Sequence, residues 1–145
     1  MVARNSLEMV YDMIDGFTEE QYEEAIRSVF DAQPFLLEFL VGHSEGWIQA
    51  QATSLSFFLF KAYETEHPGK SITVEREDIE AAFDQAKAWM AYGPYETEPT
   101  LLTFITESVI RLLENGIRLS SGEQSDILLL IKTVVLALDR AWGNS

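Results

Sequence analysis

The sequence of 145 residues contains no cysteine. This absence excludes a disulfide framework, a thiolate metal site and a cysteine nucleophile, and it is typical of proteins that fold in a reducing compartment. The N-terminal residues include Glu8 and Asp12, which the apolar region of a secretory signal would not contain. We therefore expect a cytoplasmic protein.

Basic residues are scarce. The chain has 10 lysines and arginines against 24 aspartates and glutamates, so its formal net charge is −14 at pH 7. Nucleic acids and anionic membranes are bound mainly through lysine and arginine. The longest apolar stretch, residues 127–138, also contains Lys132 and Thr133. It is about a dozen residues long, whereas a membrane span needs roughly 20. The sequence thus predicts neither a nucleic-acid partner nor a membrane partner.

Motifs for catalysis and metal binding are missing as well. The chain has no Gly-x-Ser-x-Gly nucleophile motif and no glycine-rich phosphate loop. Glu64 and His67 have the Glu-x-x-His spacing of di-iron bundles, but those sites need a second copy and two further glutamates. Because His67 also precedes Pro68 at a helix end, we expect no metal site. Nothing indicates a cofactor, and no catalytic constellation is recognisable.

Two residues support an enzyme as the least favoured hypothesis. His43 lies in a turn beside Glu45, where a carboxylate can orient a histidine base. Glu38 is the carboxylate with the most apolar sequence neighbours. The alternative interpretations are a surface histidine and a glutamate at the one solvated position of a short helix. An enzyme would require Glu38 and His43 to meet in one concave site.

The remaining composition is that of a globular protein. Hydrophobic residues make up 47% of the chain and aromatic residues 12%, which is enough for one core in a single domain of residues 1–145. Apolar residues recur at helical spacing in each long segment, and no pair of short alternating segments flanks a hairpin turn. We predict an all-α fold, either a bundle or an orthogonal array of about seven helices.

Chemical signals mark most of the predicted helix ends. Thr18 and Gln21 form a capping box before one helix, and Ser121 with Gln124 offers another before the last. Glycine or proline follows most helices, including Gly42 after a short helix that begins at Phe35. The predicted helices cover approximately residues 5–16, 18–33, 35–41, 45–66, 73–92, 99–115 and 121–142.

Acidic residues are concentrated in two segments. Residues 1–33 hold eight acidic against two basic residues, and residues 73–99 hold seven against two. Several of these acids fall near predicted helix N-termini, where the helix dipole favours negative charge. We interpret both segments as solvated outer faces. The alternative is an acidic docking surface for a basic protein.

The predicted helix 45–66 is apolar on two sides, so we expect it to be central. One side presents Phe57 and Phe60 together with the uncharged polar residues Gln49, Thr53 and Ser56. A stripe of uncharged polar side chains suits a helix contact or the wall of a small-molecule pocket better than open water.

The last predicted helix carries Leu129 and Leu136 inside an otherwise polar sector. Apolar residues at this heptad spacing resemble a helix–helix seam, and a two-fold axis with a second copy would cover it. Burial under the N-terminal helix of the same chain would explain the two leucines equally well.

The leading hypothesis is a non-catalytic interaction or structural protein that acts as a homodimer through the last helix, with a further protein partner as an open option. The alternative is a small-molecule binding or sensing bundle with a pocket beside helix 45–66. The sequence shows no resemblance that names a family, a ligand or a pathway.

Overall fold

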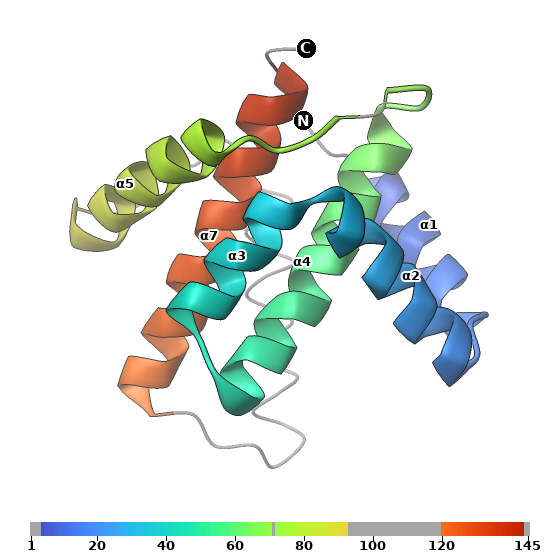
Figure 1. Ribbon diagram of the computed structural model, residues 1–145, viewed down its shortest axis with the longest axis horizontal. Coiled ribbons are helices and arrows are strands. Elements are labelled where there is room, and N and C mark those ends of the chain that lie inside the picture. The colour runs from blue at the N-terminus through green and yellow to red at the C-terminus, as the bar shows by residue number, and fades with distance from the viewer. Residues whose placement is uncertain (1–3, 71, 93–119, 144–145) are drawn as a thin grey trace.

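The computed structural model describes residues 4–70, 72–92 and 120–143. Within these ranges the chain forms helices and no strand, which confirms the all-α fold class (Figure 1). The helices are α1 (Arg4–Asp15), α2 (Glu19–Ala32), α3 (Pro34–His43), α4 (Gly46–Glu66), α5 (Arg76–Tyr92) and α7 (Ser121–Gly143). The helix predicted over residues 99–115 lies outside the described residues.

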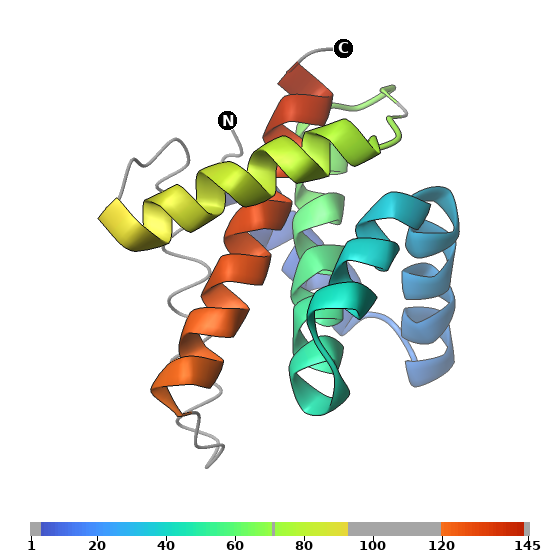
Figure 2. The same cartoon turned by 60° about the vertical axis from the view of Figure 1, so that its left-hand side comes forward.

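Helix α4 is central to the described fold, as the sequence predicts. It runs beside α7 in the same direction, while α3 runs in the opposite direction against both (Figure 1). Figure 2 shows α5 crossing α7 at a steep angle. Helices α1 and α2 also pack on α4, so α4 is covered on several sides. Its buried residues include Ala52, Leu59 and Ala62 on one side and Phe57 and Phe60 on the other.

Capping boxes fix the starts of α2 and α7. In α2, the backbone N–H of Gln21 donates to Thr18 Oγ1, and the N–H of Thr18 donates to Gln21 Oε1, as predicted. In α7 the prediction is wrong by one residue. The reciprocal bonds join Ser120 and Glu123, at 3.1 Å each, instead of Ser121 and Gln124. The sequence offers both pairs, and the chain uses the one with a charged acceptor, which forms the stronger hydrogen bond.

Helix α3 continues beyond Gly42, where the sequence predicts its end. His43 Nδ1 donates to the carbonyl of Phe39 at 2.9 Å, and Ser44 Oγ donates to the carbonyl of Leu40. Leu40 is one of the last four residues of α3, whose carbonyls have no backbone partner within the helix, so the Ser44 hydroxyl satisfies one of them. The left-handed glycine of this connection is Gly46, with a φ of 58°.

Gln33 determines how α5 is placed beside α3. The residue is 2% exposed, its Nε2 donates to the carbonyl of Ile72 at 2.7 Å, and its Oε1 accepts from the N–H of Val74 at 2.8 Å. One amide thus pairs two backbone groups of the connection that leads into α5. Buried backbone groups need such partners, because each group left without one costs about 1–3 kcal/mol.

Replacing Gln33 with leucine keeps a side chain of similar size but removes both bonds. We expect the free energy of unfolding to fall by about 2–4 kcal/mol, because one buried and one part-buried backbone group lose their partners. Urea denaturation followed by circular dichroism measures this change. Gln85→Leu on the exposed face of α5 is the matched control. Equal stability of the two variants would contradict the role assigned to Gln33.

Candidate functional site

The stripe of α4 that the sequence predicts as a pocket wall is mostly occupied by contacts within the chain. Thr53 Oγ1 donates to the backbone carbonyl of Gln49 at 2.7 Å, and Gln49 Nε2 donates to the carbonyl of Ser44 at 3.2 Å. The ring of Phe57 meets that of Tyr22 edge to face, with centroids 5.6 Å apart. Thr53 and Gln49 therefore bond to nearby backbone, and Phe57 packs α4 against α2.

The other two residues of the stripe are buried. Ser56 has no exposed surface, and its Oγ has no hydrogen-bond partner among the described residues. Phe60 lines a hollow of about 150 Å³, which we call the Trp142 pocket. This pocket is lined by Ser28, Val29, Ala32, Gln33, Phe60, Lys61, Glu64, Lys70, Ile72 and Trp142.

The two leucines predicted as a dimer seam differ in exposure. Leu136 is 5% exposed in the single chain, and Leu129 is half-buried. The neighbouring polar residues Lys132 and Thr133 are buried too. Lys132 Nζ lies 5.1 Å from the ring centroid of Trp89 on α5, which packs on α7 more extensively than any other described helix. The centre of this sector is therefore covered within one chain, and the homodimer stays a prediction.

A groove between α3 and α5 brings apolar and charged side chains together. It has a volume of about 290 Å³. Its lining consists of Phe35, Glu38, Phe39, Gly42, His43, Arg76, Ile79, Glu80 and Phe83. We call it the α3–α5 groove.

Aromatic contacts build the wall of this groove. The rings of Phe39 and Phe83 meet edge to face, with centroids 5.4 Å apart. His43 lies against both rings, at 4.6 Å from Phe39 and 4.8 Å from Phe83. Because His43 Nδ1 carries the hydrogen donated to a carbonyl, Nε2 of the neutral ring is left as an acceptor.

An ion pair crosses the rim of the groove. Arg76 Nη2 lies 3.2 Å from Glu38 Oε2, and the guanidinium of Arg76 lies over the ring of Phe35 at 4.9 Å. Both charged side chains are more than half exposed. The pair is worth little to stability at this exposure.

The groove contains both residues of the enzyme hypothesis but does not join them. No hydrogen bond or ion pair between Glu38 and His43 occurs in the described part of the chain. Five positions apart on one helix, they project about 140° from each other. Glu38 instead occupies a solvated position of α3. This agrees with the alternative interpretation from the sequence, a glutamate at the solvated position of a short helix.

A second hollow adjoins the groove at Gly42 and His43. It has a volume of about 550 Å³ and is open to solvent, and its lining includes Val41, Glu45 and Asp126. Val41 is 56% exposed. This extension adds two carboxylates and an exposed apolar side chain to the end of the groove.

Sequence reasoning identified Glu38 and His43 but missed the aromatic lining. Phe35 and Phe39 on α3, and Ile79 and Phe83 on α5, are each spaced four residues apart and match ordinary core faces. One signal was available. Every position of residues 35–41 except Glu38 is apolar. The segment therefore has more apolar surface than a single contact with the core can cover.

Tests for two other kinds of site are negative within the described ranges. No cluster of three or more histidine, aspartate or glutamate side chains there is arranged to hold a metal ion. No described helix combines the length and the apolar character that crossing a bilayer requires. In comparisons with known proteins, no family model, no curated protein and no solved structure matches the chain.

Proposed function

We propose that the protein is a non-catalytic binding protein whose α3–α5 groove holds a basic amphipathic helix of a partner protein. The observation that carries this proposal is a groove with the half-buried rings of Phe35 and Phe83 in its lining, whose charged residues are Glu38 and Glu80 against Arg76. An apolar groove between two helices is a common way to bind the apolar face of a third helix.

The size and openness of the groove favour a helix over a small molecule. Small-molecule sites usually measure about 300–1,000 Å³ and enclose most of the ligand. The α3–α5 groove has about 290 Å³ and is open to solvent, which suits a few large apolar side chains of a docked helix. Phe35 and Phe83, which are both half-buried, would contact those side chains, since aromatic residues contribute much of the energy at protein interfaces.

The charge around the groove favours a basic partner. Glu80 lines the groove and Glu45 and Asp126 line its extension, while Arg76 is paired with Glu38. The whole chain carries −14, so a cationic partner is attracted at long range and a second acidic copy is repelled. Lysines beside the apolar face of a partner helix would meet the carboxylates at the rim.

A fluorescent peptide with leucines along one helical face and lysines on the other tests the proposal by anisotropy. We expect Phe83→Ala and Glu80→Lys each to weaken binding by about tenfold, which is the size of one interface contact worth 1.4 kcal/mol. Glu20→Lys on α2 has the same charge change at an exposed position away from the groove, and it should leave affinity nearly unchanged.

A second peptide of the same composition, with its leucines spread around the helix, is the control for pattern. Circular dichroism of each variant shows whether the fold is intact. The proposal is overturned if the two peptides bind equally well, or if Glu20→Lys weakens binding as much as Glu80→Lys does.

The homodimer through Leu129 and Leu136 is a separate proposal, and the burial of Leu136 within one chain weakens it. Light scattering distinguishes the two states. A mass of 16.4 kDa excludes the dimer. A wild-type mass twice as large, which falls to the monomer value in Leu129→Glu, would support the dimer. It would also locate the dimer contact at the half-buried Leu129.

A further inference from the structure

We infer that the partner helix crosses α3 at Gly42, so that it occupies the α3–α5 groove and the second hollow together and places its most basic end over Glu45 and Asp126. This inference rests on the proposed function. It adds the course of the partner helix, the point of its closest approach to α3 and the position of its basic residues.

The groove and the second hollow form one continuous depression, which we call the trough. Gly42 and His43 line both parts. The groove runs along α3, because Arg76 contacts Phe35 at one end and Phe83 contacts His43 at the other. These two ends are eight positions apart on α3, or about 12 Å, so the groove takes about two turns of a docked helix. A longer helix continues past Gly42 into the second hollow.

Gly42 is a glycine that the fold itself does not require. It lies within α3 and is not among the described glycines with a positive φ, so its backbone conformation suits a residue with a side chain. A Cβ at this position would meet no atom within 4 Å outside its own helical turn. Glycine also loses more conformational freedom on folding than alanine does. Its missing side chain instead leaves the passage between the two hollows open, where another backbone can approach closely.

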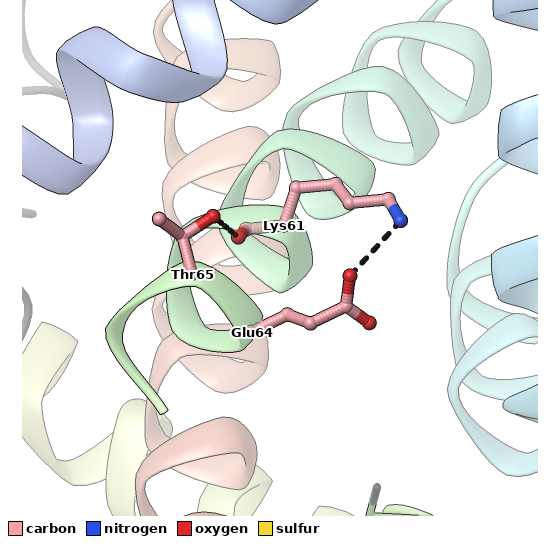
Figure 3. A network of polar contacts seen from close by, with 3 residues as sticks. All are labelled: Lys61, Glu64 and Thr65. Atoms are coloured by element: carbon pink, nitrogen blue, oxygen red, sulfur yellow. Dashed lines mark hydrogen bonds and ion pairs between the residues drawn. The ribbon is translucent and has the colours of Figure 1, made fainter. Parts of the chain in front are cut away.

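Two carboxylates lie at the far end of the trough without a partner in the described part of the chain. Glu45 precedes α4 but makes no capping bond with its side chain, and Asp126 on α7 makes no hydrogen bond or ion pair there. Glu64 on α4 differs, since Figure 3 shows its Oε1 paired with Lys61 Nζ at 3.1 Å, beside the bond from Thr65 Oγ1 to the carbonyl of Lys61. The two carboxylates of the trough are thus available to a cation from outside the chain.

The negative charge of the trough increases toward this end. In the groove, Arg76 offsets one of the two glutamates, Glu38 and Glu80. The second hollow has Glu45 and Asp126, and its described lining includes no lysine or arginine. Complementary charges across an interface attract a partner and fix its register. The partner helix therefore carries its largest cluster of basic residues at the end that reaches the second hollow.

Gly42→Leu tests the course of the partner helix. The probe is a leucine–lysine peptide of about 18 residues, which is long enough as a helix to span both hollows. A leucine side chain closes the passage, so we expect its affinity, measured by anisotropy, to fall at least about tenfold. The urea midpoint should not fall, since leucine is a better helix former than glycine. Ala88→Leu, at an exposed position of α5 outside both linings, is the control for added bulk.

Gly42→Ala separates binding from stability. The methyl group reduces the conformational freedom of the unfolded chain and has open space around it, so the urea midpoint should rise. Affinity for the peptide should fall, although less than in Gly42→Leu. If Gly42→Leu loses its helical circular dichroism, Gly42→Ala decides the question, and an unchanged affinity in that variant would overturn the inference.

Asp126→Lys tests the position of the basic end. We expect affinity to fall about tenfold, because a repelling charge replaces an attracting one. Asp31→Lys makes the same change at an exposed position of α2 outside the trough, and it should have little effect.

Two results would overturn this inference and leave the proposed function intact. In the first, Phe83→Ala weakens binding but Gly42→Leu does not, so that the partner occupies the groove alone. In the second, Asp126→Lys has no larger effect than Asp31→Lys. If the wild-type chain does not bind the peptide at all, the proposed function and this inference fail together.

Discussion

The contact between α4 and α7 supports the other described helices. Tyr63 on α4 is 1% exposed, and its hydroxyl donates to the carboxylate of Asp139 on α7. Its ring lies 5.7 Å from that of Trp142. A buried tyrosine hydroxyl needs a partner, and this pairing supplies one while the rings exclude water. Helices α1 and α2 then pack on α4, α5 packs on α7, and α3 contacts both.

The Trp142 pocket and the α3–α5 groove both depend on this pair of helices. The Trp142 pocket takes Phe60 from α4 and Trp142 from α7, next to the Tyr63 contact. The α3–α5 groove lies one layer further out, where α3 rests on α4 and α5 rests on α7. Gln33 then fixes the connection into α5, so that Phe83 comes to lie against Phe39.

The sequence predicts the parts of this structure that local chemistry determines. The Thr18–Gln21 capping box and the burial of α4 on two sides are confirmed, because both follow from residues close in the chain. The end of α3 is mispredicted, since side-chain bonds from His43 and Ser44 replace the glycine stop. The start of α7 is ambiguous, because two overlapping boxes satisfy the same rule.

The candidate sites were less accessible to sequence reasoning. Thr53 and Gln49 bond to nearby backbone, and a polar stripe used in this way has the same spacing as one that faces a ligand. The α3–α5 groove joins Glu38 to Arg76, 38 positions later, through a connection that Gln33 holds. No periodicity within one helix reveals such a pairing.

Hydrogen exchange of the full chain, with and without the leucine–lysine peptide, tests the central claim most directly. The account predicts slower exchange in α3 and in the first half of α5, because a docked helix would cover the groove between them. Protection confined to the acidic outer face of α2, with α3 and α5 unchanged, would contradict it.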